Sequence, residues 1–228
     1  MKTRNPAFVR WLPAFLGAAL LPLLAGCASP GSTAVALSRS YRPDNVFGGN
    51  GQLPAGIRRV AVLPLVCDPQ STDLTVGRDT LEPVLIAELN KTKKFEVVRV
   101  PAEEMERLFG RAEWTGDEVL PANFLEELGK EYGCDAVLFC QLTEYQAYVP
   151  LAVGWRMRLV EVEGQRTLWA GDEDFDAGKP SVVAGARSYQ RREEVQLGDE
   201  TADWLAINSP RWFGQYSIAC LLGTLPDR

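Results

Sequence analysis

The chain has 228 residues, with 24 Lys and Arg against 30 Asp and Glu, and it contains no histidine. The missing histidine excludes His-based catalytic triads and most zinc sites, and it removes the usual general base. The formal net charge of −6 repels phosphate backbones, so we expect no nucleic-acid partner.

The first 26 residues have the three parts of a secretory signal peptide. Three basic residues come first, residues 11–24 form an apolar run that contains two prolines, and two small residues follow. A transmembrane helix needs about 20 consecutive apolar residues, so this run is too short to span a bilayer comfortably. Residues 1–26 are therefore predicted to be a lipoprotein signal peptide.

Leu24, Ala25 and Gly26 stand directly before Cys27, and this order resembles the bacterial lipobox. The resemblance implies that the Cys27 thiol carries a diacylglycerol, with palmitate as a natural label. Two or more acyl chains hold a protein stably on a membrane, so the predicted partner of Cys27 is the lipid bilayer. Ala28 stands where lipoproteins retained at the inner membrane tend to carry Asp. We therefore expect an exported protein, anchored to the outer membrane and facing the periplasm.

Residues 27–56 are predicted to be a flexible tether that starts at the lipidated cysteine. Residues 28–38 are small and polar, and residues 48–56 are rich in glycine. Such a composition cannot bury enough apolar area to become ordered.

Three short apolar runs predict buried strands, and helical patterns separate them. Strands that alternate with helices imply a parallel sheet with right-handed crossovers. Pro83 fits its helical pattern if the main helix begins near Thr80. The predicted strands are 58–65, 94–100 and 134–142, and the predicted helices are 80–92, 101–110 and 121–133.

A period of two follows from residue 145, because every odd position from 145 to 159 is apolar. This alternation predicts a strand with one buried face. Residues 163–165 read as a turn, after which a partner strand returns, so 145–176 is predicted to be an antiparallel hairpin. Whether the hairpin stays in the core sheet or inserts elsewhere is left open.

The tail is predicted to be helical, with Ser209 as N-cap and Pro210 as the first helical residue of its last helix. Its aromatic residues have two interpretations. They can pack the tail onto the sheet, or they can form an exposed patch for a protein partner. Trp155, Trp212 and Phe213 are the candidates for such a partner surface.

Four cysteines remain besides Cys27, and an exported location permits disulfide bonds. The candidates are Cys67, Cys134, Cys140 and Cys220, which allow three full pairings. Cys134 and Cys140, which lie in and beside an apolar strand, can equally be buried thiols. There is no CxxC pair, calcium loop, P-loop or known catalytic motif, so we expect no metal, no cofactor and no catalytic residues.

Four stretches between residues 57 and 178 resemble a group of bacterial envelope lipoproteins. They are "RRVAVLPL", "LIAELNKTKKFEVVRV", "LGKEYGCDAVLFCQLTEY" and "MRLVEVEGQRTLWAGDEDF". They resemble the shared domain of curli-assembly (CsgG-type) lipoproteins and of the lipoprotein activators of penicillin-binding proteins, which is similar to the N-terminal domain of the Tol periplasmic protein. The resemblance implies a mixed sheet flanked by helices, no catalytic residues, and work done through protein contacts.

The predicted fold is α/β: a mixed sheet of parallel βαβ units plus an antiparallel hairpin, flanked by helices, with a helical C-terminal tail. Residues 57–178 form the predicted α/β domain, and residues 179–228 are predicted to pack on it. The predicted function is that of a non-catalytic accessory factor that binds an envelope protein during cell-envelope assembly. Two alternatives stay open: a homo-oligomeric, CsgG-like secretion channel, and an envelope hydrolase.

Overall fold

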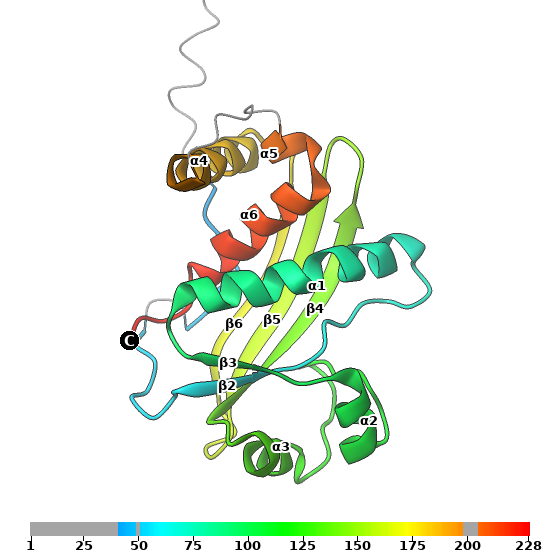
Figure 1. Ribbon diagram of the computed structural model, residues 1–228, viewed down its shortest axis with the longest axis vertical. Helices are drawn as coiled ribbons and strands as arrows, with labels where there is room; N and C mark the ends of the chain where they lie inside the picture. Colours follow the sequence, from blue (N-terminus) through cyan, green and yellow to red (C-terminus); the bar gives the residue numbers. More distant parts are fainter. Residues whose placement is uncertain (1–40, 49–50, 198–204) are drawn as a thin grey trace, which may run out of the picture. The chain divides into compact units, whose positions relative to one another are not determined.

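The computed structural model describes residues 41–48, 51–197 and 205–228 (Figure 1). The predicted signal peptide and the lipobox residues Leu24, Ala25, Gly26 and Cys27 lie outside these ranges. The described strands form a six-stranded sheet in the order β1-β6-β5-β4-β2-β3. The strands are β1 (Val46–Phe47), β2 (Arg59–Val62), β3 (Glu96–Arg99), β4 (Ala136–Gln146), β5 (Ala152–Glu161) and β6 (Thr167–Asp176). The helices are α1 (Thr72–Thr92), α2 (Ala102–Phe109), α3 (Phe124–Tyr132), α4 (Pro180–Leu197), α5 (Leu205–Asn208) and α6 (Pro210–Leu222).

The parallel half of the sheet consists of β2, β3 and β4, with β2 between the other two. From β2 the chain crosses to β3 through α1, and it then passes back across β2 to β4 through α2 and α3. Because right-handed crossovers in opposite directions fall on opposite faces, α1 packs on one face and α2 and α3 pack on the other (Figure 1). We call these the α1 face and the α2 face.

The other half of the sheet is an antiparallel meander of β4, β5 and β6. Side chains alternate between the faces, so odd positions such as Trp155 and Met157 join the α1-face core. Val160 instead joins the core beneath α2 and α3. The predicted α/β fold, with parallel units, an antiparallel hairpin, flanking helices and a helical tail, is confirmed.

The strand predicted from residue 145 is divided in the structure. Tyr145 belongs to the end of β4, residues 147–151 form a loop, and β5 begins at Ala152. The alternation of apolar residues continues through the loop, although Val149 is exposed there. The period of two therefore predicted correctly which side chains face the core, but it did not reveal the turn between β4 and β5.

The first helix begins eight residues before the predicted start at Thr80. The Ser71 hydroxyl accepts a hydrogen bond from the backbone N–H of Leu74 at 3.3 Å and caps a helix that runs through Pro83 to Thr92. The early turns are retained because Gly77 lies directly against the ring of Tyr145, where a Cβ would come within 2.5 Å of the ring. Tertiary packing therefore outweighs the hydrogen bond that Pro83 removes.

Helix α6 lies beside α1 on the α1 face (Figure 1). Ser209 is its N-cap and Pro210 its first residue, as predicted. Two indole N–H groups of the sheet hold the helix: Trp155 Nε1 donates to Ser217 Oγ at 2.8 Å, and Trp169 Nε1 donates to Thr224 Oγ1 at 3.1 Å.

This packing corrects the predicted partner surface. Trp155 and Phe213 have no exposed area, and Trp212 is only partly exposed. Phe213 and Tyr216 of the tail close the α1-face core, because a helix laid over β5 and β6 buries its large side chains there. Trp155 and Phe213 therefore cannot meet a partner.

Residues 41–48 belong to the range predicted as tether, yet in the structure they lie along β6. Val46 and Phe47 pair with Gly171 and Ala170 of β6. The buried Glu173 carboxylate accepts hydrogen bonds from the Tyr41 hydroxyl and from two backbone N–H groups, those of Asp44 at 3.2 Å and Asn45 at 3.3 Å. This part of the predicted tether is thus held by the domain.

Candidate functional site

The four cysteines of the domain are free thiols in the structure. Burial raises the pKa of Cys67, Cys134 and Cys140, and it raises the pKa of Cys220 to about 11. A thiol is nucleophilic as its thiolate, so all four are poor nucleophiles near neutral pH. The disulfides offered by the sequence are not formed in this structure.

The described residues contain neither a helix suited to cross a membrane nor a metal-binding cluster. None of their helices combines the length and the apolar character that crossing a membrane requires. No group of three or more Cys, Asp or Glu side chains in these residues is arranged to hold a metal ion. The remaining candidates for a functional site are surfaces that can bind other molecules.

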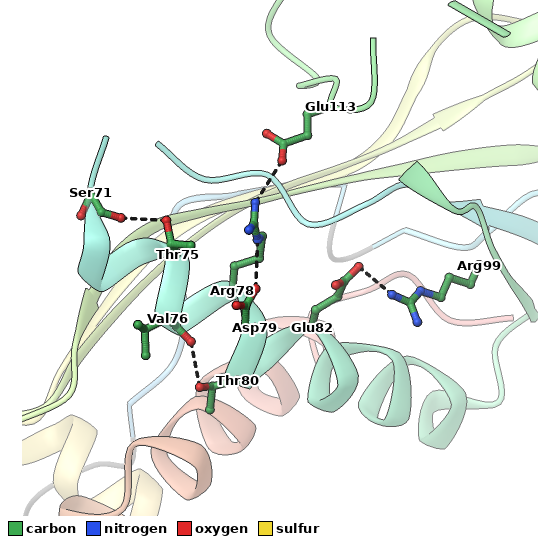
Figure 2. A network of polar contacts seen from close by, with 9 residues as sticks. All are labelled: Ser71, Thr75, Val76, Arg78, Asp79, Thr80, Glu82, Arg99 and Glu113. Carbon is green, nitrogen blue, oxygen red and sulfur yellow. Dashed lines mark hydrogen bonds and ion pairs between the residues drawn. The ribbon is translucent and has the colours of Figure 1, made fainter. Parts of the chain in front are cut away.

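A cleft of about 530 Å³ lies where β2 and β3 end, at the edge of the parallel strands where α/β folds commonly bind ligands. Figure 2 shows Arg78, Asp79, Glu82, Arg99 and Glu113 among its lining side chains. The Arg78 guanidinium donates to Glu113 at 3.0 Å, and Arg99 forms an ion pair with Glu82 at 3.2 Å. Because both arginines are paired with carboxylates, the cleft lacks the available cation that an anionic ligand would need. The network ties α1 to β3 and to the loop before α3.

The other candidate is the part of the α2 face that belongs to β5 and β6. The helices α2 and α3 and the loop between them cover β2 and the first half of β4, where the second core cluster lies. Beyond this cover the sheet presents polar side chains and a shallow hollow of about 150 Å³. We call this surface the open face, formed by Phe47, Asp117, Gln141, Arg156, Arg158 and Asp172.

The charged side chains of the open face form a continuous series of ion pairs from β6 across β5 to the loop between α2 and α3. Arg156 Nε donates to Asp172 at 2.8 Å, and its guanidinium lies 3.5 Å from Asp117. Arg158 donates to the other oxygen of Asp117 at 2.7 Å. The hydrogen bond to Asp172 raises the pKa of Arg156, which keeps this cation charged.

The open face remains accessible despite these pairs. The side chain of Arg156 is 43% exposed and that of Asp172 is 44% exposed. Phe47, on the edge strand beside them, is 61% exposed. An accessible aromatic ring next to arginines is the composition found at the centre of protein interfaces.

Sequence reasoning missed the residues of the open face, although a signal for them was present. Arg156 and Arg158 are the polar positions of the alternating run "WRMRL", so they had to lie opposite Trp155 and Met157. Asp172 stands at an even position of the returning strand, so the same alternation places it on the face opposite Trp169. What the pattern could not show is that α2 and α3 leave these positions uncovered.

The hairpin at residues 145–176 is part of the core sheet in this structure. Its strands β5 and β6 are interior members, and Trp155 and Trp169 are completely buried beneath α6. A membrane-inserted hairpin built from these strands would have to expose both indoles.

No protein-family model matches the chain, and no curated protein matches it in sequence. Solved structures with distant similarity include the PelC dodecamer from Paraburkholderia phytofirmans, at 14% identity and a TM-score of 0.44, covering 78% of this chain and 94% of that one. The lipoprotein GNA1162 from Neisseria meningitidis has 20% identity and a TM-score of 0.41, covering 61% and 99%. The LpoB C-terminal domain from Salmonella enterica has 18% identity and a TM-score of 0.33, covering 53% and 85%.

These similarities are too distant to assign the chain to a family. They also leave the CsgG-type part of the sequence resemblance as a prediction.

Proposed function

We propose that the chain is a bacterial envelope lipoprotein, held at the outer membrane by acylated Cys27, whose domain binds another envelope protein without catalysing a reaction. The lipobox sequence at residues 24–27 supports the anchor. A protein with two or more acyl chains stays on the bilayer, so its partner meets it at the membrane surface.

The observation that carries the binding role is the open face. It joins exposed Phe47, two arginines and Asp172 on the sheet with Asp117 of the loop between α2 and α3, and neither helix covers the strand residues. Surface ion pairs with this exposure add little to stability, so their arrangement is available for recognition. Paired positive and negative groups also fix the orientation of a partner of matching charge.

The anchor is tested by Cys27→Ser. The substitution removes the acylated thiol, so palmitate labelling should disappear and the protein should leave the membrane fraction. The wild-type chain should be labelled and should sediment with membranes. Palmitate labelling that persists in the Cys27→Ser chain would refute the anchor.

The binding surface is tested by crosslinking in intact cells, followed by mass spectrometry. We expect Arg156→Glu to abolish the main crosslinked partner, because it reverses a charge at the middle of the open face. Lys130→Glu is the matched control, since Lys130 is 77% exposed on α3 and lies outside the open face. Equal loss of the partner in both variants, or no loss in either, would rule out the open face as the binding surface.

A further inference from the structure

The loop between β4 and β5 exposes two large side chains at its tip. Tyr148 is 68% exposed and Val149 is 64% exposed. No charged residue occurs between Glu144 and Arg156, which makes this the least polar turn of the meander. We call residues 147–150 the apolar tip.

The apolar tip is held firmly by its neighbours. The Gln146 side-chain amide donates to the carbonyl of Tyr148 at 3.2 Å and also to that of Pro150. Leu151 is buried, and its carbonyl accepts the N–H of Ala177 at 2.8 Å. The two side chains are therefore presented by a braced turn, which lowers the ordering entropy of any contact that they make.

The chain from the predicted acyl anchor reaches the domain at this same end of the sheet. Tyr41 is the first described residue, and its ring centroid lies 5.3 Å from that of Phe175. The backbone N–H of Tyr41 donates to the carbonyl of Ser181. Phe175 is paired with Val153 of β5, only a few residues beyond the apolar tip. In Figure 1 the β4–β5 turn accordingly lies at the end of the sheet where α4 and α5 also lie.

The connection to the predicted anchor joins the domain at the apolar-tip end of the sheet, which favours this end as the one nearer the bilayer. Fourteen residues from Cys27 to Tyr41 span at most about 50 Å when fully extended. The turn between β5 and β6 is at the opposite end, about 33 Å further away along a ten-residue strand. That turn carries Glu163 and Arg166, whose charges favour water.

We propose that Tyr148 and Val149 insert into the headgroup region of the leaflet that holds the acyl anchor, so that the sheet stands with its apolar tip on the membrane. This inference rests on the proposed anchor at Cys27. Tyrosine suits this location because its ring has an apolar body and a polar end. The carboxylates of Glu144, Asp174 and Asp176 lie behind the tip, which limits insertion to the tip itself.

The test uses the full-length acylated protein in vesicles of phosphatidylethanolamine and phosphatidylglycerol. The photo-crosslinker p-benzoylphenylalanine replaces Tyr148 in one protein and Gln165, in the opposite turn, in another. We expect about tenfold more lipid adduct from position 148, since burial of one such side chain shifts partition by about that factor. Equal adduct at both positions, or adduct at 148 to protein instead of lipid, would overturn the inference.

Palmitate labelling of the same samples separates this inference from the proposed function. Labelled protein without a lipid adduct at 148 refutes the membrane contact and leaves the anchor intact. Unlabelled protein refutes the anchor, and the inference with it.

A second pair of variants tests the apolar character of the contact. In the chain that carries the probe at position 148, Val149→Asp should lower the lipid adduct about tenfold, because a carboxylate resists leaving water. Val119→Asp is the control, since Val119 is 95% exposed in the loop between α2 and α3. Equal effects of the two substitutions would contradict insertion of the tip.

Discussion

The two faces of the sheet share the same strands and differ in what covers them. On the α1 face α1, α4 and α6 all contribute to the core, in which Trp155, Trp169 and Phe213 have no exposed area. On the α2 face two short helices and a loop cover β2 and part of β4 and leave Arg156 and Asp172 of the meander accessible. The difference indicates that the α1 face supplies most of the stability, and that the α2 face offers the surface for recognition.

The strongest test of this comparison substitutes neighbours on one strand that point to opposite faces. Trp155→Ala should lower the free energy of unfolding by about 3–5 kcal/mol, because it leaves a large cavity beneath α6. Arg156→Ala should change it by less than about 0.5 kcal/mol, because its ion pair is half exposed. Urea denaturation of the purified proteins measures both, and similar losses in the two variants would contradict the assignment of stability to the α1 face.

Glu173 is a polar residue among the apolar side chains of the α1 face. Its substitution should lower the free energy of unfolding less than that of Trp155 does. Glu173→Ala removes the acceptor of three hydrogen bonds and should cost about 2 kcal/mol. The loss should be local, so hydrogen exchange should accelerate over residues 41–47 and stay slow in α6. Glu173→Gln, which keeps an acceptor oxygen, should have a smaller effect. Unchanged exchange in Glu173→Ala would show that the carboxylate does not hold this segment.

Removal of a single hydrogen bond that attaches α6 should lower the free energy of unfolding less than Trp155→Ala or Glu173→Ala does. Ser217→Ala leaves the buried Trp155 N–H without its acceptor, and we expect a loss of about 1–2 kcal/mol. Thr224→Ala, at the partly exposed second attachment, should cost less. A larger effect of Thr224→Ala on the urea midpoint would reverse the proposed order of the two indole contacts.

The two faces of the sheet differ in how much of their structure could be predicted from the sequence. Periodicity identified the strands and the inward direction of Trp155, because alternation is a local property of the backbone. It could not identify the covering helix, since Ser217 and Trp155 are 62 positions apart in the sequence. Trp155 and Phe213 were included in the candidate partner surface for the same reason. The sequence pattern of an aromatic residue is the same in a core and in an interface. Only the position of α6 shows that Trp155 and Phe213 belong to the core.

The beginning of α1 and the place of residues 41–48 were also beyond local patterns. The early turns of α1 depend on the ring of Tyr145 against Gly77, and residues 41–48 depend on Glu173, which comes 128 to 132 positions later in the chain than its partners. The lipobox, in contrast, is a contiguous motif that needs no tertiary contact to be recognised.

The smallest predicted effect concerns Glu144, beside Asp174 and Asp176. Partial desolvation and the repulsion of these two carboxylates raise the pKa of Glu144. The folded protein therefore binds this proton more tightly than the unfolded chain does, so ionised Glu144 opposes folding at neutral pH. The penalty disappears as the pH falls through the raised pKa of Glu144.

Glu144→Gln should consequently stabilise the protein at pH 7, by less than about 0.5 kcal/mol because the side chain is exposed. The gain should vanish in acid, below the pKa of about 4.3 that a free glutamate has. Thermal unfolding at both pH values measures it, with Glu163→Gln in the opposite turn as the control. A gain that persists in acid would mean that the amide acts through packing or hydrogen bonding rather than through the removed charge.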